Sequence, residues 1–242
     1  MNAAAFGAAW LNPARSILGS EQRNWLTAAL SGSSARWQVL GSQVLMGKIY
    51  IPAEMLPLVA QLAGSGATPA LLQQYTTLAT QLITIKTRIA AGDPTVTAAE
   101  RARVETVLPY NLDAWDGYPI EREAVLAAAG SKKLVALAGD THNAWYSDLT
   151  TSTGRRVGVE FAAPSVSSPG FEAFFGGNAA AIQGFEQANT ALINDLHYLD
   201  ASRRGFLEVS FTNSAATGTW KYVADLATET AATTTGRTES YA

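Results

Sequence analysis

The sequence predicts an α/β domain in which helices flank a mixed β-sheet. Short apolar segments typical of strands lie at 37–46, 133–139, 156–163, 205–211 and 218–224. Segments with apolar residues at helical spacing lie between several of them. The chain has 242 residues, of which 48% are hydrophobic, so it can bury a sizeable core. We therefore expect the five strands to form one mixed sheet.

The composition excludes several classes of protein. Lysine and arginine total 17 against 20 aspartate and glutamate residues, with no long basic run, which argues against a nucleic-acid-binding protein. Without cysteine the chain has no disulfides or thiolate sites, so any metal must bind to oxygen and nitrogen. No run of about 18 apolar residues predicts a membrane span. The apolar N-terminal segment lacks the basic residues of a secretory signal, so we expect no signal peptide in this chain.

The first expected elements are a helix over about 20–30 and the strand at 37–46. The helix has one apolar face and can be capped at its N-terminus by Ser20. Its apolar face consists of Trp25, Leu26, Ala29 and Leu30. The strand contains a polar Gly41-Ser42-Gln43 stretch after its apolar start.

Residues 53–107 differ from the rest of the chain, because they hold few aromatic residues and much Ala, Leu, Gln and Thr. Apolar residues at steps of four and three form one helical stripe: Leu71, Tyr75, Leu78, Leu82, Ile85 and Ile89. Thr97 and Glu100 have capping-box spacing, which indicates a second helix. We expect a helical hairpin inserted into the main domain on the outside of the sheet. So short a stripe is more typical of core packing than of a partner zipper.

Two more helices are expected in the second half, over 119–129 and about 178–193. The strands at 205–211 and 218–224 are expected to form a hairpin, because a polar Asn213-Ser214 turn separates them. From Thr228 on there is little to bury, so residues 228–242 are expected to be a flexible tail.

The most informative segment for chemistry is Asp140-Thr141-His142, directly after the strand at 133–139. Sites in α/β proteins usually lie at the carboxyl ends of strands. Carboxylate oxygen suits a hard divalent cation and imidazole nitrogen suits iron, zinc or manganese, so the pair could serve two neighbouring metals. The alternative is that Asp140 caps the next turn and His142 is a surface imidazole. With no Gly-x-Ser-x-Gly and only two histidines, a serine hydrolase triad is unsupported.

Six segments in order resemble the alkaline phosphatase D (PhoD-like) branch of the metallophosphoesterases. They are LGSEQRNWL (18–26), WQVLGSQV (37–44), WDGYPIER (115–122), GDTHNAW (139–145), VEF leading to PSVSSPG (159–170), and YLD with RGF (198–206). The resemblance implies metallophosphoesterase-like mixed β-sheet layers flanked by helices, of which this chain holds half of a four-layer αββα sandwich. It also implies that residues 1–227 are the C-terminal part of the catalytic domain, with 53–107 as the helical insert.

The resemblance further implies a two-metal centre of iron and calcium, with manganese or zinc as alternatives. Asp140 would bind the divalent metal and His142 the ferric one. Gln43 could bind a calcium-like ion through its amide oxygen or hydrogen-bond a metal-bound water. The alternative for Gln43 is a buried strand-end amide satisfied by backbone.

The catalytic residues that the resemblance implies are Asp116, Arg122 and Asn143. Asp116 could orient His142 or line the substrate mouth, and Arg122 could meet a phosphate oxygen. The alternatives are an Asx turn for Asp116 and a solvated helix position for Arg122. The serines at 165–168 are expected to lie in a loop that packs against the metal loop, and His197 is expected to be structural.

The activity implied by the resemblance is hydrolysis of a phosphomonoester or phosphodiester in the periplasm or outside the cell. The family's upstream ligand blocks have no counterpart before Leu18, so we expect an incomplete metal centre here. The alternative is a non-catalytic fragment or interaction module. A sheet face left open by the absent part would favour a homodimer or association with the missing N-terminal half-domain.

Overall fold

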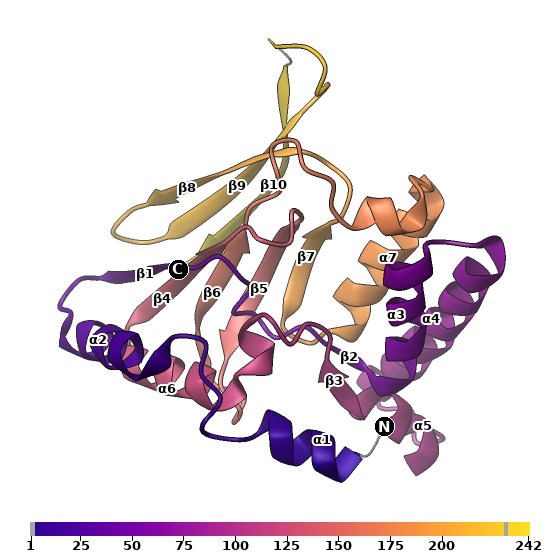
Figure 1. Cartoon of the computed structure of the whole chain (residues 1–242), viewed down its shortest axis with the longest axis horizontal. Coiled ribbons are helices and arrows are strands. Elements are labelled where there is room, and N and C mark those ends of the chain that lie inside the picture. The colour runs from indigo at the N-terminus through magenta and orange to yellow at the C-terminus, as the bar shows by residue number, and fades with distance from the viewer. Residues whose placement is uncertain (1–2, 230–231) are drawn as a thin grey trace.

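A five-stranded mixed sheet forms the centre of the computed structural model, which describes residues 3–229 and 232–242 (Figure 1). Its strands are β1 (Trp37–Gly41), β4 (Lys133–Ala138), β5 (Ala144–Thr150), β6 (Arg156–Ala162) and β7 (Leu196–Asp200). They lie in the order β1-β4-β6-β5-β7. Strands β1, β4 and β6 are parallel, whereas β5 is antiparallel to β6 and β7. The α/β class expected from the sequence is confirmed, and the sheet is mixed, but only β1, β4 and β6 are among the five strands that were expected in it.

Helices cover one face of this sheet. Helices α2 (Gly19–Gly32) and α6 (Pro119–Ala129) lie beneath β4, where Leu26 and Val125 pack in one cluster with Leu134. Helix α7 (Ala179–Leu192) packs beneath β5 and β7, with Phe185 in one cluster with Trp145. The short helix α1 (Ala3–Trp10) lies at the edge of this layer (Figure 1).

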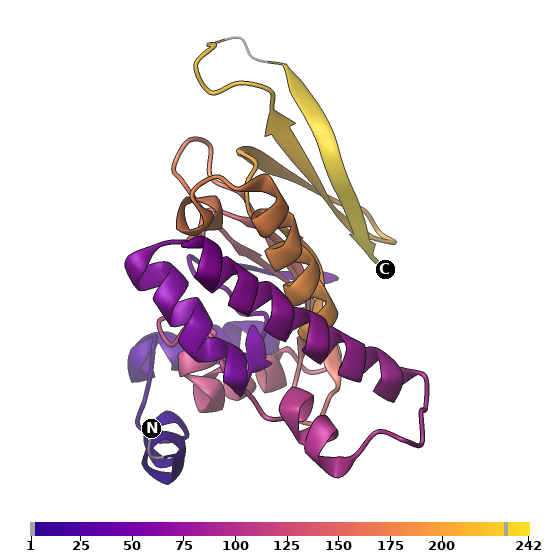
Figure 2. The same ribbon diagram turned by 90° about the vertical axis from the view of Figure 1, so that its right-hand side faces the viewer.

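The helical insert is present. It contains η1 (Ala53–Met55), α3 (Leu56–Ser65), α4 (Pro69–Ala90) and α5 (Ala98–Glu105). Its two ends are joined because β2 (Tyr50–Pro52) pairs antiparallel with β3 (Val107–Pro109). The capping box of Thr97 and Glu100 is formed, and the apolar stripe of α4 is buried at Tyr75 and Leu82. Figure 2 shows that α4 packs against α7, so the insert lies outside the sheet.

A second, antiparallel sheet covers the other face. Its strands β8 (Gly205–Phe211), β9 (Ala216–Val223) and β10 (Thr233–Tyr241) lie in the order β10-β9-β8. Buried and half-buried residues alternate along β9, which is typical of a sheet with one face on the core. Trp220 packs in one cluster with Val135 and Phe161, and its indole N–H donates to the Ala162 carbonyl at 2.8 Å.

Several sequence-based expectations about strands are wrong. The segments 205–211 and 218–224 were expected in the first sheet, but they form β8 and β9 of the second. Their sheet lies on the face of the first, because the apolar side chains of β9 pack against it. Residues 233–241 are not a flexible tail but strand β10, while residues 230–231 lie outside the described part. Strand β1 ends at Gly41 rather than at 46, because the backbone N–H groups of Met46 and Gly47 turn to the carboxylate of Glu160.

The sheet face expected to be open is covered. The three-stranded sheet packs on it with Ala216, Trp220 and Tyr222, so the reason given for a homodimer does not hold at that face. No helix in the described part of the chain is long and apolar enough to cross a membrane.

Candidate metal site

The turn 139–143 joins β4 to β5 at the edge where the parallel strands end. Asp140 is exposed there and His142 is half-buried. His142 has a φ of 60°, and no other non-glycine residue in the described ranges has a positive φ. This left-handed conformation is uncommon without glycine and concentrates at functional sites. The backbone therefore directs the two predicted ligands to one edge of the sheet.

Gln43 lies at the same edge. The Ser42 N–H donates to the Leu137 carbonyl at 2.8 Å, which extends the β1–β4 pairing beyond β1. The Gln43 carbonyl then accepts from the backbone N–H groups of Gly139 at 3.1 Å and Asp140 at 2.9 Å. The Gln43 side chain is exposed, so it is not the buried strand-end amide of the alternative interpretation. The structure thus joins the backbones of Gln43 and Asp140, at the edge of the sheet that also carries His142.

The imidazole of His142 is oriented by a backbone carbonyl. Its Nδ1 lies 2.9 Å from the Pro169 carbonyl oxygen, which accepts a hydrogen bond but cannot donate one. Nδ1 must therefore carry the proton, and in the neutral ring Nε2 keeps its lone pair. Metal-binding histidines usually donate their second ring N–H to such an acceptor.

Asn143 braces the loop that carries Pro169. Its side chain is fully buried, its Oδ1 accepts from the Phe171 N–H at 3.1 Å, and its Nδ2 donates to the Thr141 carbonyl. Gly170 packs so closely that an added Cβ would overlap Asn143 Oδ1. The expected contact between the 165–168 loop and the Asp140–His142 turn is therefore made, but through Pro169 and Gly170 rather than the serines.

An ion pair between Glu172 and Arg204 fixes the same loop. Both carboxylate oxygens of Glu172 accept from the Gly170 N–H, at 3.1 and 3.0 Å. The buried guanidinium of Arg204 donates to Glu172 in turn. The Gly205 N–H also donates to the Ser165 carbonyl at 2.9 Å. These contacts fix the position of the Pro169 carbonyl and, through it, the ring of His142.

Asp116 and Arg122 lie in a different place from these residues. Their exposed fractions are 2% and 1%. Asp116 Oδ2 accepts from the Ile49 N–H at 2.8 Å, and Arg122 donates to the carbonyls of Met46 at 2.7 Å and Thr150 at 2.9 Å. Neither is hydrogen-bonded to Asp140 or His142. The two residues brace the 46–49 segment rather than line a substrate mouth.

The charge of this buried cluster is not balanced. Glu160, which is fully buried, accepts from the N–H groups of Met46 and Gly47 at 2.6 and 2.9 Å. Burial raises the pKa of Asp116 to about 7 and that of Glu160 to about 7, and Arg122 only partly offsets this rise. Asp116 Oδ1 and Arg122 Nη2 have no hydrogen-bond partner among the described residues. The sequence did offer a signal for Glu160, since it is the one charged residue in the apolar run 157–161.

His197 is placed as the sequence suggests for a structural residue. His197 is on β7, where its Nε2 lies 3.1 Å from Asp148 Oδ2 and its ring packs on Tyr146 of β5. It makes no contact with the turn 139–143.

The donor chemistry at this edge fits a metal ion. Asp140, His142 and the Gln43 amide supply three donor groups, and the orientation of His142 fits metal binding. In residues 3–229 and 232–242, however, no group of three or more His, Cys, Asp or Glu side chains is placed to hold a metal ion.

Comparison with known proteins decides the family. The family profile described as PhoD-like phosphatase matches residues 2–220. The chain belongs to the PhoD-like phosphatase family. It is similar to alkaline phosphatase D of Bacillus subtilis (strain 168), with 28% identity over 166 residues, which are 66% of this chain and 20% of that protein. The family assignment agrees with the resemblance of the six sequence segments.

A solved structure of PhoD has the same fold over nearly the whole of this PhoD-like chain. The TM-score is 0.60 at 19% identity, and the match covers 97% of this chain and 35% of that one. At such identity the likeness shows the fold alone. The PhoD-like chain thus spans well under half of both relatives.

Sequence reasoning did not single out Pro169, Glu172 and Arg204. Pro169 acts through a backbone carbonyl, which no side-chain pattern reports. Glu172 and Arg204 are 32 residues apart, so only the fold brings them together. The one available signal was Arg204 next to the buried Gly205, in a segment already noted for its resemblance.

Proposed function

We propose that residues 1–227 are the C-terminal part of a phosphoric ester hydrolase whose active site lies at the Asp140–His142 edge. Membership of the PhoD-like phosphatase family supports the reaction class. The observation that carries the site is His142, since its strained backbone and its bond to Pro169 leave Nε2 free, two residues from Asp140 in the same turn. The completed site would hold two metal ions, iron and calcium or alternatively manganese or zinc, with a phosphate ester as substrate and a periplasmic or extracellular location.

The proposed roles of the other residues follow from their contacts. Gln43 is a third ligand candidate because its side chain is exposed and its backbone carbonyl accepts from the Asp140 N–H. Asn143 acts as a positioning residue, since it ties the 139–143 turn to Phe171. Asp116 and Arg122 are enclosed, so they act by holding the 46–49 segment and not by touching the phosphate.

The remaining ligands are proposed to come from another segment of a PhoD-like domain, added at β1. Strand β1 is an edge strand in the described sheet, and a hollow of about 570 Å³ lies beside it, between β1 and α2. Trp25 and Val39 line this hollow and are 66% and 49% exposed. A parallel strand added there would end beside Gln43 and Asp140, because parallel strands have their carboxyl ends at one edge.

Metal titration tests the site directly. Calorimetry with Mn²⁺, Ca²⁺ and Zn²⁺ should show binding to the wild-type chain and a loss of at least about tenfold in affinity for His142→Ala and Asp140→Asn. His197→Ala is the matched control and should bind like wild type. Equal binding by all four proteins would exclude the assignment.

Hydrolysis is measured in parallel on p-nitrophenyl phosphate and bis-p-nitrophenyl phosphate. We expect the chain alone to be inactive or very slow, because its ligand set is incomplete, and any activity present should require His142. Activity that survives His142→Ala would contradict the proposal.

A second candidate function is a non-catalytic interaction module. The shortage of acidic and imidazole ligands in the described residues favours it. Metal binding that ignores Asp140 and His142, together with no hydrolysis under any metal, would support this second function.

A further inference from the structure

A pocket lies at the opposite end of the sheet from His142. Its volume is about 450 Å³, which suits a small organic ligand. Thr150, at the carboxyl end of β5, and Asp195, just before β7, form one wall. Lys86 and Ile89 of α4 form the other, so the pocket follows the seam between the insert and the sheet.

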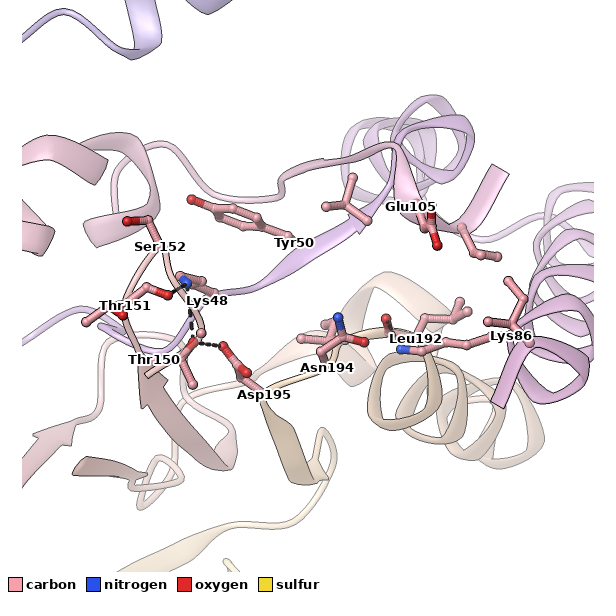
Figure 3. A pocket seen from close by; sticks show the side chains of 15 residues that line it. Lys48, Tyr50, Lys86, Glu105, Thr150, Thr151, Ser152, Leu192, Asn194 and Asp195 are labelled. Carbon is pink, nitrogen blue, oxygen red and sulfur yellow. Dashed lines mark hydrogen bonds between the residues drawn. The ribbon is translucent and has the colours of Figure 1, made fainter. Parts of the chain in front are cut away.

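Two lysines occupy opposite ends of this pocket (Figure 3). Lys48 Nζ donates to Thr150 Oγ1 at 3.2 Å and to the Thr151 carbonyl at 2.9 Å, which leaves one N–H unused. Lys86 Nζ donates to the Leu192 carbonyl at 2.7 Å, which leaves two. Each end can therefore donate further hydrogen bonds into the pocket.

The acidic residues of the pocket form no ion pair with these lysines, although the Asp195 carboxylate acts on Lys48 at longer range and partly offsets the fall of its pKa. Glu105 pairs with Arg101 at 3.0 Å, and Asp195 accepts from the Thr150 hydroxyl. Neither lysine is within ion-pair distance of a carboxylate in the part of the chain that the structure describes. Burial lowers the pKa of Lys48 and of Lys86, which is the sign of a desolvated cation that an anion would stabilise.

The space between the two ammonium groups is mainly apolar. Figure 3 places Tyr50 and Asn194 between the lysines. The apolar lining is made of Ile89, Val104, Val107, Leu192 and Ile193. A ligand that fills the pocket needs an apolar middle and hydrogen-bond acceptors at its ends.

We propose that this pocket, here called the two-lysine pocket, binds a small organic dianion with an acidic group at each end and an apolar spacer. One acidic group accepts from Lys48 and the other from Lys86. Because the pocket lies at the other end of the sheet from Asp140 and His142, it is independent of the proposed phosphatase site.

Calorimetry on the full chain with succinate, adipate and suberate tests the proposal. We expect one-to-one binding with a Kd of about 1 mM or tighter for the diacid whose length fits. Hexanoate, which has one acidic group, should bind at least about tenfold more weakly, and adipamide, which has none, should not bind. No saturable binding of any diacid, or equal binding of adipate and hexanoate, would overturn the proposal.

Substitution of each lysine locates the ligand. Lys48→Gln and Lys86→Gln should each weaken binding at least about tenfold. Lys132→Gln is the matched control, because Lys132 also donates to carbonyls at a helix end, those of Leu30 and Ser31, away from the pocket. Lys86→Arg keeps the charge and the contact with α7, so it should retain binding even if Lys86→Gln unfolds. Binding unchanged in both glutamine variants, or weakened equally in Lys132→Gln, would exclude the two-lysine pocket.

Discussion

The ring of His142 depends on a carboxylate that it does not touch. Glu172 accepts from Gly170 and pairs with Arg204, and together they hold the Pro169 carbonyl that faces Nδ1. The histidine is thus oriented by three successive contacts: Arg204 with Glu172, Glu172 with Gly170, and Pro169 with His142. If the contact between Pro169 and His142 is released, the proton of the neutral ring is free to move between Nδ1 and Nε2.

Replacement of Glu172 by glutamine tests this chain of contacts. Nitrogen NMR of the two histidines in wild type should show His142 protonated at Nδ1 when neutral. Glu172→Gln should reduce that tautomer and destabilise the fold by about 3 kcal/mol, because the buried Arg204 loses its partner. The ring of His197 is the internal control, since its contact is with Asp148. An unchanged His142 spectrum would contradict the role of Glu172.

The buried carboxyls Asp116 and Glu160 make stability depend on pH. Each has a pKa raised to about 7 in the folded chain, so the folded state binds their protons more tightly than the unfolded state does. The contribution of these two carboxyls to stability is therefore fully present below their unfolded pKa values, near about 4, and is lost as the pH rises through about 7.

Urea unfolding between pH 5 and pH 8 measures this effect. Asp116→Asn should flatten the loss of stability by up to a few kcal/mol, because the amide has no charge to desolvate. Asp113→Asn changes an exposed carboxylate three residues away and should keep the wild-type slope. If the free energy of unfolding falls with pH at the same rate in wild type, Asp116→Asn and Asp113→Asn, Asp116 does not titrate in this range.

At the scale of elements, the close approach of the two sheets depends on a glycine. A Cβ at Gly218 of β9 would lie 2.6 Å from Phe161 Cδ1, in the core between the sheets. Gly218→Ala should cost about 1–3 kcal/mol in thermal or urea unfolding. Gly64 of α3 has open space around it, so Gly64→Ala should be neutral or stabilising by up to about 1 kcal/mol. Equal stability of the two variants would mean that β9 can move away from β6.

The sequence predicted best the elements whose pattern is local. The stripe of α4 and the capping box of Thr97 are examples, because helical spacing and a four-residue motif suffice. Strand β5 was missed because it begins directly after the Asp140–His142 turn and is buried on both faces, without alternation. The division of the strands into two sheets depends on contacts such as Trp220 with Ala162, which are distant in sequence.

The same distinction holds for the candidate site. Asp140 and His142 stand in one short motif, and Gln43 follows a parallel strand, so their position at one edge could be predicted. The burial of Asp116 and Arg122 could not, because it depends on the 46–49 segment crossing beneath the sheet. Their metal-binding and catalytic roles stay predictions.

At the scale of the whole molecule, the exposed edge at β1 is where we expect the chain to associate. With β8–β10 on one face and helices on the other, the hollow beside β1 is where Trp25 and Val39 remain open to water. We expect a second copy of the chain to occupy this edge when no other partner is present. A two-fold interface is self-complementary, and two β1 strands paired across it would be antiparallel.

Such a homodimer could not complete the metal site. Antiparallel pairing places the partner's Asp140 and His142 at the far end of the shared sheet, whereas a parallel strand from another segment would end beside Gln43. We therefore expect light scattering to show a concentration-dependent rise above 25.5 kDa, without any gain in phosphatase activity. Val39→Lys places a charge on the edge strand and should keep the chain at 25.5 kDa, while Val166→Lys, at an exposed loop position, should not. A dimer that hydrolyses p-nitrophenyl phosphate and persists in Val39→Lys would mean that two copies meet elsewhere and share their ligands.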